Sequence, residues 1–203
     1  MPPPVSPGLD VWNACTDPDR ISRWFLPVTG DLRLGGHYQL QGNAGGEILR
    51  CEAPRQLKVT WVFGDDPTEA DVTEVELRLT PGADGETLLE LEHAAVVDPE
   101  RWAEYGPGAV GVGWDLTLLG LSLPLRGGSI EDPAAWLESP EAKTFIAQSS
   151  QAWRAAHEAA GATSAEAEMA GKNTATFYDP SAGSNDDPRS PLLSASSSPR
   201  HPS

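Results

Sequence analysis

The stretch Ala109–Leu125 (AVGVGWDLTLLGLSLPL) constrains the fold most, because it is the longest nearly uncharged apolar run and only Asp115 interrupts it. At helical spacing its large side chains gather on one stripe and its flank: Val112, Leu116, Leu118, Leu119, Leu121 and Leu123. The run falls short of the roughly 18 to 20 unbroken apolar residues of a membrane span, and it contains several glycines. A helix that is apolar around most of its circumference is a buried one. The sequence therefore predicts a core helix that other elements cover.

The residues before this helix switch to a period of two, which is typical of strands with one buried face. Turn residues such as Gly42–Gly46 and PGADG separate the alternating segments. The expected strands lie within Asp31–Leu40, with a bend at Gly35-Gly36, and then Glu47–Glu52, Leu57–Phe63, Val75–Leu79 and Leu89–His93. Five strands in meander order before a buried helix predict an α+β fold, in which an antiparallel sheet curls around the helix.

Helical patterns lie on both sides of these strands. Two short helices are expected within Leu9–Leu26, and longer ones at Ser139–Ala160 and Ser164–Tyr178. The prolines before Leu9 disfavour a regular element, and the Ser/Pro-rich C-terminal residues offer almost nothing to bury. The expected organisation is a proline-rich N-terminus (1–8), one domain (9–160), a short helical extension (161–178) and a disordered tail (179–203).

Composition excludes several classes of partner. The net charge of −16 and the isoelectric point near 4.4 argue against nucleic acid and anionic membranes, because both require a basic patch. Cys15 and Cys51 are too few for a disulfide framework or a thiolate metal site, so we expect a reduced, cytoplasmic protein. The first residues lack the basic and apolar regions of a signal peptide. The excess of arginine over lysine, with abundant Ala, Gly and Pro, hints at a GC-rich bacterial genome.

The glycine and histidine motifs do not predict a cofactor or a metal. Gly106–Gly111 (GPGAVG) has the spacing of a dinucleotide-binding loop, but the preceding DPERWAEY is polar and helix-like rather than a strand. We interpret these glycines as letting the sheet pack close to the first turns of the core helix. The four histidines, His37, His93, His157 and His201, lack metal-site spacing. We therefore expect neither a cofactor nor a metal.

His93 is the polar residue that stands out, because it shares one face of the last strand with Leu89 and Leu91. A structural, hydrogen-bonded histidine is the interpretation we favour. The alternative is a ligand handle or an acid–base group, since the pKa of histidine lies near neutrality; Tyr38 and Arg50 are the candidate partners. Alternation predicts a cavity between sheet and helix lined by Tyr38, Trp61, Phe63, Leu91, His93, Trp114 and Leu118.

Four segments resemble a known family: VWNACTDPDRISRWFLP, GDLRLGGHYQL, GGEILRCEAPRQLKVTW and TLLELEHAAV, in this order. The family is the activator of heat-shock-protein-90 ATPase homologue-like group of the START-like (SRPBCC) superfamily, and the resemblance covers about residues 9–160. It implies the helix-grip fold, in which a curved antiparallel sheet wraps a long C-terminal helix around a cavity. His93 falls where the family often has histidine, which implies an inward-facing side chain. Arg50 stands where acidic residues are common, which puts any carboxylate site there in doubt.

The resemblance leaves the activity open, because the superfamily includes lipid and hormone carriers, polyketide cyclases and chaperone cofactors. We expect binding of a small, mostly apolar ligand in the cavity, without catalysis. A cyclase or isomerase is the first alternative, and it requires that His93 and a second polar group converge in the cavity. A chaperone-cofactor role is the second, and it requires an exposed patch for the partner.

The family's opening strand has no counterpart in this chain, where MPPPVSPGLD stands in its place. The resemblance implies that this strand pairs with the final strand, here Leu88–Val97. Prolines lack the amide hydrogen that a ladder needs, so we expect the final strand to have an unpaired edge. Two explanations stay open: the chain as given starts downstream of its natural start, or a genuine short form makes a homodimer through this edge.

Overall fold

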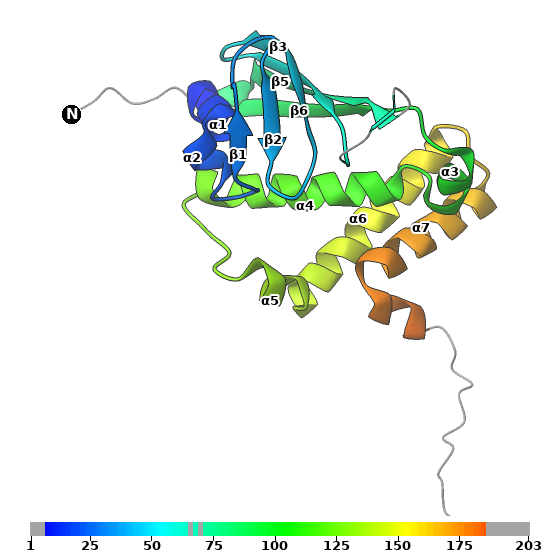
Figure 1. Cartoon of the computed structure of the whole chain (residues 1–203). Helices are drawn as coiled ribbons and strands as arrows, with labels where there is room; N and C mark the ends of the chain where they lie inside the picture. The colour runs from blue at the N-terminus through cyan, green and yellow to red at the C-terminus, as the bar shows by residue number, and fades with distance from the viewer. Residues whose placement is uncertain (1–6, 65–66, 69–70, 186–203) are drawn as a thin grey trace, which may run out of the picture.

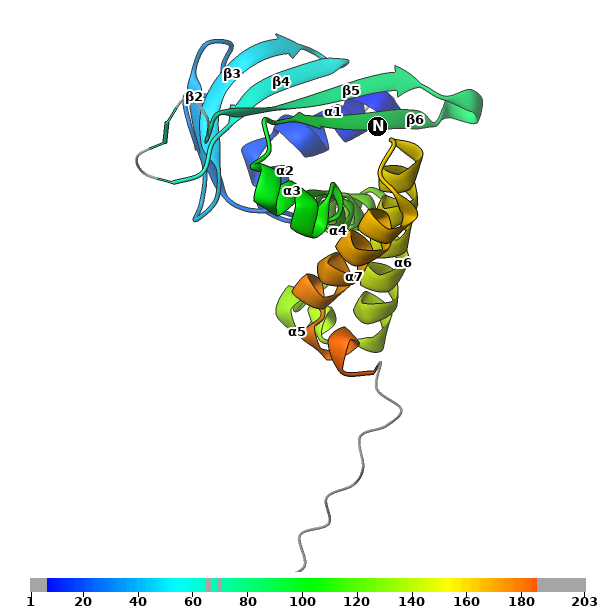
Figure 2. The same ribbon diagram turned by 90° about the vertical axis from the view of Figure 1, so that its right-hand side faces the viewer.

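A six-stranded antiparallel sheet lies on one side of the long helix α4 (Gly108–Leu125), and α6 (Pro140–Ala159) and α7 (Ser164–Tyr178) lie on its other side (Figure 1). The computed structural model describes residues 7–64, 67–68 and 71–185. Turned by 90°, the molecule shows the sheet as a curved layer above α4 (Figure 2). The α+β helix-grip fold expected from the sequence is confirmed.

The strands follow each other in the sheet in the order in which they occur in the chain. They are β1 (Val28–Gly30), β2 (His37–Leu40), β3 (Gly45–Glu52), β4 (Gln56–Trp61), β5 (Thr73–Pro81) and β6 (Thr87–Ala94). Every neighbouring pair is antiparallel. Short turns connect such strands, which is why the sequence pattern predicts a meander.

The register of the last three strands separates two faces. On the inner face, Leu57 of β4 lies opposite Leu77 of β5, which lies opposite Leu91 of β6. On the outer face, Lys58, Glu76 and Glu92 form the neighbouring column. Since the side chains of a strand alternate between its two sides, apolar residues face α4 and charged residues face solvent.

The first expected strand differs from the observed one. The sequence predicts a strand from Asp31 to Leu40, whereas β1 ends at Gly30 and β2 begins at His37. The residues between them form a tight turn, in which Gly36 N donates to the Arg33 carbonyl at 2.8 Å. Gly35 has φ +75°, which disfavours any residue with a side chain and ends the extended conformation. Leu32 and Leu34 are therefore exposed turn residues.

The N-terminal helices are α1 (Pro7–Thr16) and α2 (Pro18–Ile21), followed after the sheet by α3 (Pro99–Tyr105) and, beyond α4, by α5 (Pro133–Leu137). Side chains cap the start of five of the described helices (α2, α3, α5, α6 and α7), whereas α4 has no side-chain cap. Asp17 caps α2, Ser139 caps α6, and Thr163 forms a capping box with Glu166 at the start of α7. The expected boundaries of α6 and α7 agree with these caps. The short helix α5 was not expected from the sequence.

Two expected segment boundaries differ from the structure. Pro7, which we expect before the first helix, starts α1, because the first turn of a helix needs no amide from proline. A 3-10 helix occupies Pro180–Asn185, where the sequence predicts a disordered tail. The remainder of the predicted N-terminal segment (1–6) and of the predicted tail (186–203) lies outside the described residues.

α4 is held between the sheet and the C-terminal helices. Ser149 Oγ and Trp153 Nε1 donate hydrogen bonds to the carboxylate of Asp115, at 2.5 and 3.0 Å. A Cβ on Gly111 would collide with the Trp153 ring, so glycine is needed for this close approach. The expectation that the sheet packs against these glycines is wrong, because the residues nearest to Gly108 and Gly111 belong to α7 and α6. By length and composition alone, α4 is the one helix of the described residues that also meets the test for a membrane span, a test that many core helices meet. Here it packs against protein on two sides.

The last strand has an open edge. Within the described part of the chain, the backbone of β6 is paired with β5 and with no strand on its other side. The helix α1 contacts β5 and β6, but it forms no strand-type backbone pairing with β6. The edge that the sequence predicts at the final strand is therefore present in this fold.

Candidate functional site

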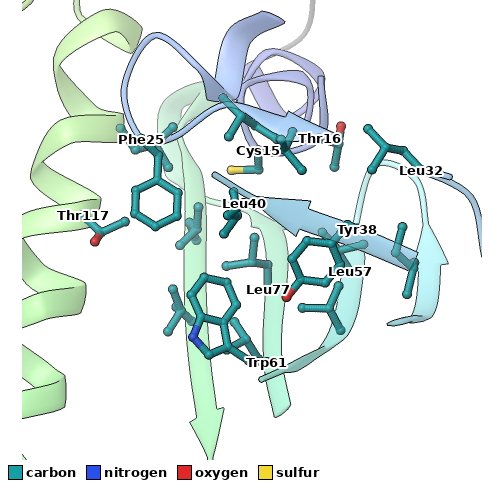
Figure 3. A pocket seen from close by; sticks show the side chains of 18 of the residues that line it. Cys15, Thr16, Phe25, Leu32, Tyr38, Leu40, Leu57, Trp61, Leu77 and Thr117 are labelled. Carbon is teal, nitrogen blue, oxygen red and sulfur yellow. The ribbon is translucent and has the colours of Figure 1, made fainter. Parts of the chain in front are cut away.

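A cavity of about 180 Å³ lies between the inner face of the sheet, α4 and the N-terminal helices. Its position follows from the fold, because α4 reaches the sheet through large side chains, and the space beside them is left unfilled. Figure 3 shows side chains of both kinds of element around it: Cys15 and Thr16 from α1, Phe25 from the segment after α2, Tyr38, Leu40, Leu57, Trp61 and Leu77 from strands, and Thr117 from α4.

Aromatic rings form one side of this cavity, and Trp61 lies at their centre. The centroid of its ring is 5.2 Å from that of Trp114 and 6.5 Å from those of Phe25 and Tyr38. Phe25 also stacks on Trp24, with 5.7 Å between centroids. Aliphatic residues from α2, the strands, the turn after β1 and α4 complete the wall: Ile21, Val28, Leu32, Leu40, Ile48, Leu57, Val59, Val75, Leu77, Leu89, Leu91, Leu118 and Leu121.

The hydroxyl groups of the wall are occupied by the protein itself. Tyr38 Oη donates to the Thr60 carbonyl, Thr16 Oγ1 to the Trp12 carbonyl, and Thr117 Oγ1 to the Gly113 carbonyl, each at 2.8 Å. Burial raises the pKa of Tyr38, so its phenol stays neutral. Because these hydroxyls are already bonded, they offer a ligand little beyond an apolar surface.

The ionisable groups of the wall include the thiol of Cys15 and the guanidinium of Arg33. Burial raises the pKa of Cys15 to about 12, with Arg20 opposing the shift, so the thiol is not an activated nucleophile at neutral pH. Of the described residues that line the cavity, Arg33 alone carries a formal charge. Its side chain is 78% exposed and pairs with Asp31 at 2.8 Å, so this charge lies toward solvent.

His93 belongs to a hydrogen-bonded chain beside the cavity. Trp114 Nε1 donates to His93 Nδ1 at 3.1 Å, and His93 Nε2 lies 2.9 Å from Thr73 Oγ1. The hydroxyl of Thr73 in turn donates to the Trp61 carbonyl at 2.6 Å. An indole N–H can only donate, so Nδ1 accepts and the proton lies on Nε2. All of these hydrogen bonds form when the imidazole is neutral. Burial lowers the pKa of His93, which also favours the neutral form.

The structure shows which residues His93 bonds to. Its partners are Thr73 and Trp114, so the expectation that Tyr38 or Arg50 would pair with it is wrong. Arg50 lies on the exposed part of β3 and pairs with Glu52 at 3.1 Å. Both ring nitrogens of His93 are engaged, and His93 is not among the residues that line the cavity.

Five of the seven residues expected around the cavity do line it: Tyr38, Trp61, Leu91, Trp114 and Leu118. His93 and Phe63 do not. Phe63 lies two residues beyond the end of β4; the residue is 58% exposed, and its ring packs edge-on against Trp61. The alternation that carries the strand's side chains inward stops where the ladder stops, which explains the difference.

The sequence missed the contribution of the N-terminal helices. Cys15, Ile21, Trp24 and Phe25 all line the cavity. The pattern shows that Ile21, Trp24 and Phe25 lie together on one apolar face, but local periodicity does not identify what that face covers.

In the described part of the chain, no group of three or more His, Cys, Asp or Glu side chains is arranged to hold a metal ion.

A curved antiparallel sheet that grips a long helix, with an apolar cavity between them, defines the START-like helix-grip class of proteins. More narrowly, the family model described as activator of Hsp90 ATPase homolog 1-like protein matches residues 6–122. The chain belongs to that family. The match ends inside α4, so α5, α6 and α7 lie beyond it. The fold is one that commonly binds ligands.

Solved structures agree with this assignment. The crystal structure of CalU16 from Micromonospora echinospora is 43% identical and covers 75% of this chain and 82% of that chain, with a TM-score of 0.57. The solution structure of the same protein is 43% identical, with coverages of 77% and 83% and a TM-score of 0.60. MLL2253 from Mesorhizobium loti, at 23% identity, coverages of 62% and 93% and a TM-score of 0.50, is similar in fold alone. No curated protein matches the chain.

Proposed function

We propose that this protein binds a small, uncharged and mostly apolar molecule in the cavity between the sheet and α4. The observation that supports this most is the chemistry of the wall, which combines aromatic rings with aliphatic side chains and has its hydroxyls already bonded. Ligand sites are typically concave and mostly apolar. A charged ligand would lose its hydration without gaining a partner inside this cavity.

The size of the cavity limits the ligand. An engineered protein cavity of roughly 150 Å³ holds one benzene molecule. A cavity of about 180 Å³ therefore suits a ligand whose buried part is one or two small rings. Trp61 and Phe25 offer ring faces against which such a flat molecule would stack.

The position of His93 supports binding rather than a cyclase or isomerase activity. Both of its ring nitrogens are bonded within the protein, and His93 is not among the described residues that line the cavity. General acid–base catalysis needs a group within hydrogen-bonding reach of the reacting atoms.

We also propose a cytoplasmic location, which the free thiols of Cys15 and Cys51 support.

A cavity-filling variant tests the proposal. Leu118 lies on the cavity wall, whereas Leu137 on α5 is 44% exposed and remote from it. An apolar dye that brightens in dry surroundings is titrated into the parent, Leu118→Trp and Leu137→Trp. We expect saturable binding to the parent and to the control, and at least tenfold weaker binding to Leu118→Trp. Equal binding to all three folded proteins, or no saturable binding to the parent, would contradict the proposal.

A further inference from the structure

The side chains next to the open edge of β6 indicate what kind of strand could pair with it. The inner side chains of this strand, Leu89 and Leu91, are half-buried and border the cavity, while Leu88, on the outer face, is 56% exposed. No strand of the described residues pairs with this edge, so its outward backbone groups form a template for a further strand. An added strand would place its own inner side chains over the apolar flank that Leu89 and Leu91 leave half-covered.

The outer face next to this edge is acidic in a regular pattern. Arg78 of β5 lies opposite Glu90, and Glu76 of β5 lies opposite Glu92. Arg78 pairs with Glu76 at 2.9 Å and with Glu92 at 2.7 Å, so one guanidinium serves two carboxylates. Glu90 has no ion pair within the described part of the chain. A strand added beside β6 would therefore meet two carboxylates that attract positive charge on its outer face.

A second copy of this chain fits the edge poorly. In an antiparallel β6–β6 pair centred on Leu91, Glu90 of each copy lies opposite Glu92 of the other. Centring the pair on Glu90 or on Glu92 places that residue opposite itself. Like charges directly opposite each other destabilise a strand pair, so the pattern disfavours these three registers, which include the two longest overlaps of β6 with itself; a homodimer is left with shorter overlaps, such as a pair centred on Leu89 or His93.

We propose that the β6 edge binds an extended segment of a partner protein, added antiparallel to β6, with apolar residues on its inner face and lysine or arginine on its outer face. Antiparallel addition continues the order of the sheet and gives the stronger ladder. On the outer face, the row of cross-strand neighbours Gln56, Arg78 and Glu90 would then be followed by a cation of the added strand. The row Lys58, Glu76 and Glu92 would be followed by another cation, so both glutamates of β6 would lie opposite a positive charge. Glu90 and Glu92 are not among the residues that line the cavity, so the proposal does not depend on the proposed ligand.

The test uses a labelled eight-residue peptide of alternating valine and lysine, with fluorescence anisotropy on the full chain. Two further peptides carry N-methyl groups, one on every valine and one on every lysine. Because the amides of a strand alternate between its two edges, an added strand tolerates only one of these peptides. The protein variants are Glu90→Lys with Glu92→Lys, and a control, Glu131→Lys with Glu168→Lys, which makes the same change in net charge at exposed positions away from β6.

We expect saturable binding to the parent and the control, about tenfold weaker binding to the Glu90 and Glu92 variant, and loss for one N-methylated peptide only. Equal loss in the control variant would mean general attraction to an acidic protein and would overturn the proposal. Equal binding of both N-methylated peptides would exclude a strand ladder. A dimer with protected β6 amides in the absence of peptide, measured by sedimentation and hydrogen exchange, would assign the edge to a second copy and also overturn it.

Discussion

Replacing His93 with alanine tests the hydrogen-bonded chain that links α4 to the sheet. His93 joins Trp114 of α4 to Thr73 of β5, and Thr73 continues to the backbone of β4. The alanine variant removes two hydrogen bonds and leaves the indole N–H of Trp114 without its acceptor. A structural role predicts a loss of stability, whereas a role in ligand recognition predicts a loss of affinity with little change in stability.

The size of the expected stability loss follows from the two hydrogen bonds of His93. Each intramolecular hydrogen bond contributes about 0.5 to 1.5 kcal/mol net, and the ring of His93 is half-buried between Trp114 and β5. We expect His93→Ala to lower the free energy of unfolding by about 2 kcal/mol. His37→Ala is the matched control, because His37 is exposed on β2, and its effect should be about 0.5 kcal/mol or less.

The pH dependence provides a second readout of the same chain. Burial lowers the pKa of His93 in the folded protein below the 6.5 of the unfolded chain. Between the two values the unfolded chain binds more protons, so the contribution of His93 to stability is present above pH about 6.5 and is lost as the pH falls. The difference in unfolding free energy between parent and His93→Ala should therefore shrink on acidification.

Urea unfolding monitored by circular dichroism, from pH 5 to pH 8, measures both effects. His93→Asn separates the two bonds, because its amide oxygen can replace Nδ1 as the acceptor for Trp114. We expect this variant to recover part of the loss. The reasoning would be refuted if His93→Ala unfolded like the parent while the apolar dye bound at least tenfold more weakly.

Three further predictions concern other parts of the molecule. At pH 8 a thiol reagent should modify the exposed Cys51 quickly and the partly buried Cys15 much more slowly, because burial raises the pKa of Cys15; Cys51→Ser should remove the fast phase. Gly106→Ala should lower the melting temperature and cost about 2 kcal/mol, since φ is +52° and the new Cβ would lie 2.5 Å from Nδ1 of His157; an unchanged melting temperature would contradict this. Asp115→Ala should cost about 2 kcal/mol in urea unfolding by removing an acceptor for two donors, and wild-type stability would show that these bonds contribute nothing.

The elements that the sequence predicts well are those encoded by neighbouring residues. The core helix is expected at Ala109–Leu125 and observed at Gly108–Leu125, and α7 is expected and observed at Ser164–Tyr178. Helical periodicity and caps depend on residues within a few positions of each other, so they can be read locally. The same holds for β5 and β6, whose sequences alternate regularly.

Misplaced elements are those in which local signals conflict. Leu32 and Leu34 alternate like a strand, but the turn that ends at Gly36 overrides them, and the short strand β1 lies earlier, at Val28–Gly30. A strand of this length has too few residues to show a period. Phe63 follows the alternation of β4, yet it lies beyond the last residue of that strand.

By itself the sequence determined the fold class, the core helix, the acidic surface and most of the strand residues that face inward. Only the tertiary structure decided that α1 and the segment after it close the cavity, that His93 bonds to Thr73 and Trp114, and that Asp115 holds α6 against α4. The hydrogen bonds of His93 and Asp115 join residues that lie 20 or more positions from each other in the sequence. Periodicity shows which face of an element is apolar, but the partner of that face depends on how the whole chain packs.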